Sequence, residues 1–207
     1  MRLARHAVAT LLILAAAPTL GAQVSRLNTQ LDPATRTAVL ALVDSARVAG
    51  LPADALVNKA LEGAGKHAAG PRIVAAVRAL AQEMRRARAA LGRGSRAEEI
   101  TAGAHALHAG ITPAQLTALR RADVGRQLTT PLMVLTDLVS RGVPAPTASA
   151  AVEALARAGV RDADFTAYQR SVRQDIDRGA DPAAAATTRA RGAALRGGGP
   201  PAARSER

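Results

Sequence analysis

Residues 109–113 read Ala-Gly-Ile-Thr-Pro, and each residue of this phrase suits a helix boundary. Glycine takes the left-handed conformation that ends a helix without a steric penalty, and the apolar residue after it packs back on that helix. The threonine side chain caps the next helix, whose first position tolerates proline because no intrahelical hydrogen bond is lost there. The phrase therefore predicts a tight turn between two helices.

Variants of this phrase recur along the chain. The clearest lie at 49–52, 141–144 and 158–162, and weaker ones lie at 69–71 and 178–182. Between them apolar residues are spaced three and four apart, and no stretch alternates as a strand would. The pattern predicts an all-α fold of about nine short helices, at 33–48, 53–62, 71–91, 96–108, 113–122, 131–140, 145–157, 163–177 and 182–190.

Two architectures fit this pattern. The Gly-capped turns are irregularly spaced, as in a degenerate array of helix-turn repeats. An ordinary compact helical bundle whose helices share good C-terminal caps would produce the same phrases. In either case the helix spacing predicts buried faces, formed by Ile73, Val77, Leu80 and Met84 in one helix and by Phe165, Tyr168, Val172 and Ile176 in another.

The two ends of the chain differ from the all-helical domain expected at 32–188. Residues 1–22 resemble a secretory signal peptide, with Arg2 and Arg5 before the apolar run 7–17 and small residues before Gln23. The run is shorter than the roughly 20 residues that cross a bilayer. We expect cleavage near Ala22, export to the periplasm or beyond, and a mature chain without a transmembrane segment.

The segments that flank the domain carry fewer bulky apolar residues. Residues 23–31 are expected to form a short N-terminal lead. Residues 189–207 contain a run of glycine and proline together with several arginines, a composition typical of a disordered basic tail.

The composition excludes several classes of site. The chain has no cysteine, so it cannot form disulfide bonds or use cysteine as a metal ligand or nucleophile. Phe165 and Tyr168 are the only aromatic residues among Phe, Trp and Tyr, which leaves no platform for stacking nucleic-acid bases. The sequence also lacks the motifs of serine hydrolases, zinc proteases and dinucleotide-binding domains. We therefore expect no catalytic residues, no cofactor and no nucleic-acid partner.

One expected helix carries a candidate metal site. Glu98, His105 and His108 share a stripe away from its buried side, and carboxylate and imidazole are the usual non-thiol ligands of Zn²⁺. However, Glu98 lies two turns from His105, and in a capping box it would bond back to Ser95. A metal-dependent hydrolase is the third interpretation, and ordinary surface histidines are the alternative to it.

Residues 72–96 are the most basic part of the expected domain. Within a chain of net charge +12, the residues Arg78, Arg85, Arg86, Arg88 and Arg93 are candidates for polyanion binding. With the basic tail, they would attract anionic lipid, lipopolysaccharide or another polysaccharide. A solvated charged face without specific function explains the same residues.

The sequence therefore favours an exported, non-enzymatic helical protein that binds or scaffolds another component of the cell envelope. Its partner is expected to be a protein or another envelope molecule, because stacked helices commonly offer extended binding faces. The electrostatic binder is the alternative.

Overall fold

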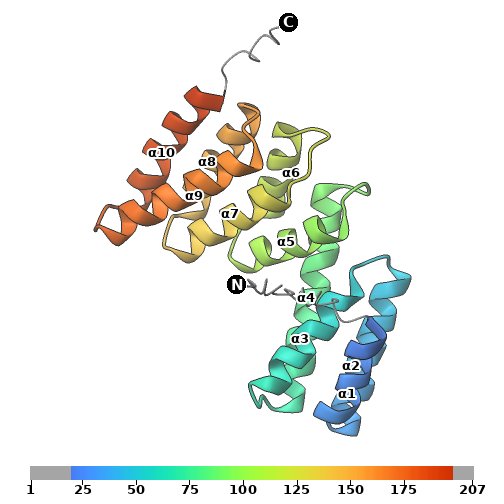
Figure 1. The fold of residues 1–207 in the computed structure, drawn as a ribbon. Coiled ribbons are helices and arrows are strands. Elements are labelled where there is room, and N and C mark those ends of the chain that lie inside the picture. Colours follow the sequence, from blue (N-terminus) through green and yellow to red (C-terminus); the bar gives the residue numbers. More distant parts are fainter. Residues whose placement is uncertain (1–19, 198–207) are drawn as a thin grey trace, which may run out of the picture.

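The computed structural model describes residues 20–197, and within them the chain forms ten helices and no strand (Figure 1). The fold is therefore all-α, as the sequence predicts. The helices are α1 (Leu20–Gln30), α2 (Pro33–Val48), α3 (Ala53–Gly65), α4 (Gly70–Leu91), α5 (Ala97–His108), α6 (Pro113–Ala122), α7 (Thr129–Ser140), α8 (Ala145–Arg157), α9 (Asp162–Asp177) and α10 (Pro182–Gly197).

The first helix lies where the sequence analysis expects only a lead. Helix α1 covers most of 23–31, and Leu27 at its core-facing side is completely buried. Leu27 and Leu31 are four positions apart, so both apolar side chains meet the rest of the fold on one side. The predicted signal peptide lies outside the described residues over 1–19, and its last three residues begin α1.

The last helix is also longer than predicted. Helix α10 continues to Gly197, so the expectation of a disordered segment is wrong for 189–197, and 198–207 lie outside the described residues. Alanine favours helix, and Ala190 and Ala193 are buried. In addition, Arg189 Nε and Nη2 donate to the two carboxylate oxygens of Asp175 on α9, at 2.6 and 2.7 Å. Packing and this bidentate ion pair hold a segment whose composition suggests disorder.

The turn phrase performs the role predicted for it. Gly110 has a φ of +100°, and the N–H of Ile111 donates to the Ala106 carbonyl at 3.0 Å. Thr112 and Gln115 exchange hydrogen bonds at the start of α6, with 2.8 Å between Thr112 N and Gln115 Oε1. The weaker phrase at 69–71 differs, because the left-handed residue there is His67 and Gly70 already belongs to α4.

The helices stack in an open two-layer array. Extensive packing is confined to helices at most two apart in the chain, and alternate helices lie side by side: α2, α4, α6, α8 and α10 in one layer, and α1 with α3 and α5, α7 and α9 in the other. Figure 1 shows the resulting elongated shape, with α1 and α10 near opposite ends. The array, and not the closed bundle, is the architecture of this chain.

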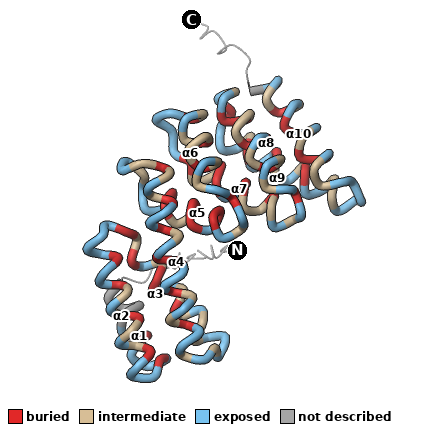
Figure 2. The backbone as a smooth tube through the Cα atoms, turned by 180° about the vertical axis from the view of Figure 1, so that it is seen from behind, coloured by how far each residue is buried: buried red, intermediate tan, exposed pale blue. Residues whose placement is uncertain are grey.

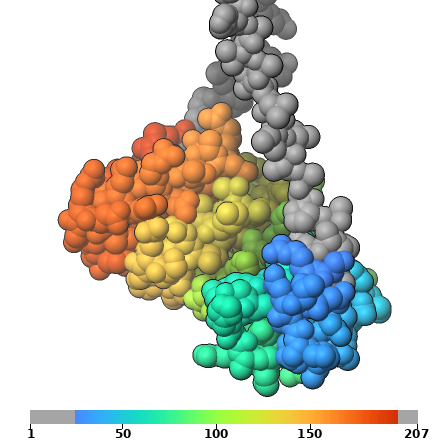
Figure 3. Space-filling model, turned by 60° about the horizontal axis from the view of Figure 1, so that its bottom comes forward, coloured from blue at the N-terminus to red at the C-terminus, as the bar shows by residue number. Residues whose placement is uncertain are grey.

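Helix α4 joins the two halves of the array. It is the longest described helix, with 22 residues, and it packs against α2 and α3 as well as α5 and α6. In space-filling view the N-terminal helices (blue to teal) form a lobe beside the yellow-to-red C-terminal helices (Figure 3). Helix α4 therefore determines how far α3 and α5 lie from each other.

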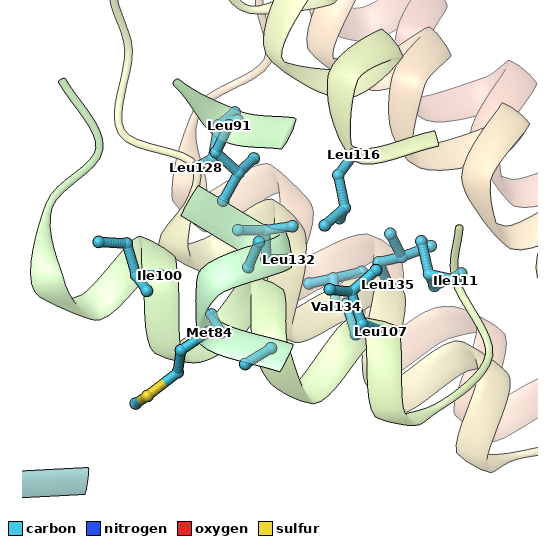
Figure 4. Packing of buried hydrophobic residues seen from close by; sticks show 14 of the residues in the cluster. Met84, Leu91, Ile100, Leu107, Ile111, Leu116, Leu128, Leu132, Val134 and Leu135 are labelled. Carbon is cyan, nitrogen blue, oxygen red and sulfur yellow. The ribbon is translucent and has the colours of Figure 1, made fainter. Parts of the chain in front are cut away.

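Every layer of the array contains buried residues, which Figure 2 shows in red along the length of the backbone. The predicted α4 face is confirmed, since Ile73, Val77, Leu80 and Met84 are all buried. Phe165, Tyr168 and Val172 of α9 are buried too, whereas Ile176 is only partly covered. Figure 4 shows the central part of this core, where α4 to α7 contribute residues that include Met84, Ile100, Leu116 and Leu132.

Candidate functional site: the groove between α3 and α5

The odd-numbered layer is interrupted at one place. Among the described helices, α1 packs on α3, α5 on α7 and α7 on α9, but α3 and α5 lack comparable packing. Between them lies a groove of about 340 Å³. We call it the α3–α5 groove; it is lined by Ala55, Asn58, Lys59 and Glu62 of α3, Ala76, Ala79, Leu80 and Glu83 of α4, and Thr101, His105 and His108 of α5.

The floor of the groove is apolar and made mostly of small side chains. Leu80 is buried, whereas Ala76 is partly exposed and Ala79 is exposed. Both alanines lie on α4 along one edge of its core face, because Ala76 is one turn before Leu80 and Ala79 is three residues after Ala76. Small side chains let a neighbouring backbone approach closely, so this floor can accept apolar groups from another molecule.

Polar and charged side chains form the two walls. On the α5 side, His108 Nδ1 lies 3.1 Å from Glu83 Oε1, which ties the wall to the floor helix. On the α3 side, Glu62 accepts hydrogen bonds from Lys66 and from Lys59, the latter at 2.9 Å. The hydrogen bonds from Lys66 and then Lys59 lower the pKa of Glu62 to about 2. The walls can therefore offer carboxylate, ammonium and imidazole groups around an apolar floor.

The structure does not gather the predicted metal ligands into one site. His105 and His108 line the groove, but the carboxylate beside His108 belongs to Glu83, and Glu98 is exposed at the start of α5. Within residues 20–197, no group of three or more His, Asp or Glu side chains is arranged to hold a metal ion.

The capping pattern expected at the start of α5 is displaced by one residue. The helix begins at Ala97, and Glu99, not Glu98, accepts the hydrogen bond from the backbone N–H of the capping residue, Arg96, at 2.9 Å. Ser95 instead donates from Oγ to the Gly92 carbonyl at 2.8 Å. The Ser95–Glu98 capping box is therefore wrong, since the chain turns one residue later than the sequence pattern suggests.

The predicted polyanion-binding residues divide into two groups. Arg78, Arg85, Arg86 and Arg93 are exposed, and none of their side chains has a hydrogen bond or ion pair within the described part of the chain. Arg88 differs, because its Nη1 donates to the carbonyls of Ala49 and Gly50 at the end of α2. Arg88 therefore has a structural role at the end of α2, which distinguishes it from the other four candidates.

Comparisons with known proteins provide no further identification. The chain matches no protein-family model, no curated protein and no solved structure. No helix in the described range is long and apolar enough to cross a membrane.

Sequence reasoning missed most of the groove. Glu83 was visible only as the single acidic residue among many arginines, and Asn58, Lys59 and Glu62 carried no recognisable signal. The spacing of Ala76 and Ala79 indicates a stripe of small residues on α4, but it does not reveal what faces that stripe. Only the separation of α3 from α5 makes these residues neighbours.

Proposed function

We propose that the protein is an exported, non-enzymatic binding module of the cell envelope that binds an amphipathic helix of a partner protein in the α3–α5 groove. The observation that carries this proposal is the interruption of the odd-numbered layer over an alanine floor. Elsewhere in that layer the neighbouring helices pack directly against each other, α1 on α3, α5 on α7 and α7 on α9. A partner helix lying between α3 and α5 would continue the same side-by-side packing.

The chemistry of the groove favours a peptide occupant. Apolar anchors on one helix face are the usual way in which a groove recognises an amphipathic helix. The alanine floor would bury such anchors, while Asn58, Lys59 and Glu62 on one wall and His105 on the other would contact polar groups beside them. The export of the protein is proposed from residues 1–22, and N-terminal sequencing of the mature protein tests it, with Gln23 expected first.

Site-specific photocrosslinking tests the groove. A benzoylphenylalanine at Asn58, an exposed position on the α3 wall, is expected to give a discrete adduct with one envelope protein. Ala79→Trp in the same chain should abolish the adduct, because the indole would fill the floor. Ala89→Trp is the matched control, since Ala89 is exposed on α4 but does not line the groove.

Thermal melts first establish that both variants fold, and the crosslinking result then supports or refutes the proposal. Loss of the adduct in Ala79→Trp together with its retention in Ala89→Trp supports the proposal. An adduct that survives Ala79→Trp, or that forms equally from a crosslinker at Ala89, places the partner elsewhere and refutes it.

A second function rests on a different surface. Arg78, Arg85 and Arg86, which we call the α4 strip, are exposed and have no internal ion pair within the described residues. Unpaired surface cations attract anionic surfaces, and salt weakens this attraction. The α4 strip and the basic C-terminal residues could thus bind anionic lipid or polysaccharide.

Co-sedimentation with vesicles that contain phosphatidylglycerol tests the second function. Replacing all three arginines of the α4 strip with Gln should lower the bound fraction. A control with the same change in net charge replaces Arg26, Arg121 and Arg170, which are exposed on other helices and lie outside the basic C-terminal residues. Equal losses in the two variants would mean that only net charge matters and that the α4 strip has no special role.

A further inference from the structure

A second concave site lies at the other end of α5, away from the groove. It is a pocket of about 290 Å³ between the loop before α5, the end of α6 and the loop between α6 and α7. We call it the arginine pocket, because Arg96, Arg120 and Arg126 all line it, together with Ser95, Glu99 and Gln127. These residues come from segments that are distant in sequence.

The single carboxylate in the arginine pocket is already occupied by internal donors. Glu99 is 3% exposed; its Oε1 accepts from Arg120 Nη2 and from the N–H of Leu128, both at 2.7 Å, and its Oε2 accepts from the N–H of Arg96. Burial by itself would raise the pKa of Glu99, but these hydrogen bonds outweigh it and keep the pKa below its ordinary value. Glu99 thus neutralises the charge of Arg120 and forms no ion pair with Arg96 or Arg126.

The remaining arginines differ in how they are held. Arg126 Nη2 donates to the Val160 carbonyl at 3.0 Å, and its Nε lies 3.6 Å from Asp123 Oδ1, so its orientation is determined by the fold. The guanidinium of Arg96 has no hydrogen bond or ion pair within residues 20–197. Gln127 is exposed and is equally without a side-chain partner there. The pocket therefore has two guanidinium groups oriented by the fold, those of Arg120 and Arg126, and free donors beside them.

The start of α5 adds to this positive character. Arg96 is the capping residue, and the first helical N–H groups follow it at Ala97 and Glu98. The N-terminal end of a helix carries a partial positive charge that favours anions. The combination of guanidinium groups, a free amide and a helix N-terminus around one cavity is the chemistry that recognises an oxyanion.

We propose that the arginine pocket binds a tetrahedral oxyanion, a phosphate group either free or carried by a lipid headgroup. Arg96 provides the mobile guanidinium that closes on the anion, and Arg126 provides a guanidinium already in place. The site is independent of the α3–α5 groove, and it shares no residue with the α4 strip. Unlike the α4 strip, it would bind one anion per chain with saturation.

Isothermal titration calorimetry with inorganic phosphate tests the site in the full-length protein. We expect saturable binding to one site, weakened about tenfold or more in Arg96→Gln, because one charge-assisted hydrogen bond is worth about 1.5–3 kcal/mol. Arg96→Gln leaves the backbone N–H that Glu99 accepts in place. Arg170→Gln is the matched control: it removes the same charge from an exposed residue of α9 that does not line the pocket and is not among the candidates for polyanion binding.

A second titration with vesicles that contain phosphatidic acid identifies the source of the phosphate. Binding of inorganic phosphate that is weakened by Arg96→Gln and not by Arg170→Gln supports a free anion. The same selective loss with vesicles alone supports a lipid headgroup. No binding of either probe by the wild-type protein, or equal losses in the two variants, overturns the proposal.

Discussion

The carboxylate of Glu99 accepts a hydrogen bond of 2.7 Å from the backbone N–H of Leu128, although the two residues are 29 positions apart. Leu128 is the capping residue of α7, and the same oxygen of Glu99 also accepts from Arg120 near the end of α6. One buried side chain thus connects the start of α5 with α6 and α7.

Replacing Glu99 tests this connection. Glu99→Ala should lower the free energy of unfolding by about 3 kcal/mol, because it leaves Arg120 Nη2 and the Leu128 N–H without the carboxylate oxygen that accepts from both. Urea denaturation measures the change. Glu98→Ala, at the exposed neighbouring position, should cost less than about 1 kcal/mol. Equal losses in the two variants would contradict a special role for Glu99.

Asp123 should make stability depend on pH in the opposite direction from most carboxylates. Burial raises its pKa above the ordinary 3.8, and the attraction of Arg126 does not compensate. The folded protein therefore holds the Asp123 proton more tightly than the unfolded chain, so stability is lost as the pH rises from 3.8 through the folded pKa. A negative charge after the end of α6 also opposes the helix dipole.

Asp123→Asn should accordingly raise the free energy of unfolding by about 1 kcal/mol at pH 7 and leave it nearly unchanged at pH 3, where both chains are neutral at this position. Urea denaturation at the two pH values measures this difference. A loss of stability at pH 7 would show that the ion pair with Arg126 outweighs the cost of burial.

Gly103 should resist the substitution that usually stabilises a helix. A methyl group there would lie 2.9 Å from Leu91 Cδ1 and 3.1 Å from Ala87 Cβ, both on the buried face of α4. Gly103→Ala should therefore cost about 1–2 kcal/mol through overpacking. Gly65→Ala in α3, with no atom within 4 Å of the added methyl group, should instead gain up to about 1 kcal/mol. Thermal and urea denaturation of both variants measure the sign of the change in stability. A gain in stability at both positions would contradict close packing of α5 on α4.

Arg88 should behave as a structural residue within a basic segment. Arg88→Ala removes the donor to the Ala49 and Gly50 carbonyls and should cost about 1–2 kcal/mol of stability. Arg85→Ala, which removes an exposed arginine without a bond, should change stability by less than about 0.5 kcal/mol. For vesicle binding we expect the opposite order of effects: Arg85→Ala should lower the bound fraction more than Arg88→Ala does. Denaturation and co-sedimentation of the same two proteins test both statements.

Much of the fold could be predicted because its signals are local. The phrase at 109–113 contains the left-handed glycine, the apolar residue and the cap that the structure uses, and these interactions join residues within a few positions of one another. The buried face of α4 follows equally from the helical repeat. The missed helix α1 and the longer α10 have weaker local signals, and they are stabilised by packing and by the Asp175–Arg189 ion pair.

The functional surfaces could not be predicted in this way. Arg85 and Arg88 look alike in the sequence, and only the position of the α2 terminus makes one of them a cap. Glu98 and Glu99 are adjacent carboxylates. Only the tertiary structure, which places Leu128 and Arg120 beside Glu99, shows which of the two is buried.

The sequence by itself determined that the described chain is a series of helices joined by Gly-capped turns, because helix periodicity and capping depend on residues near one another in the chain. The tertiary structure decided that the helices stack as an open array, that the array is interrupted between α3 and α5, and that three arginines meet at the opposite end of α5. These features depend on the distances between whole helices. Those distances follow from the length of α4 and from side-chain packing along it, which no local pattern records.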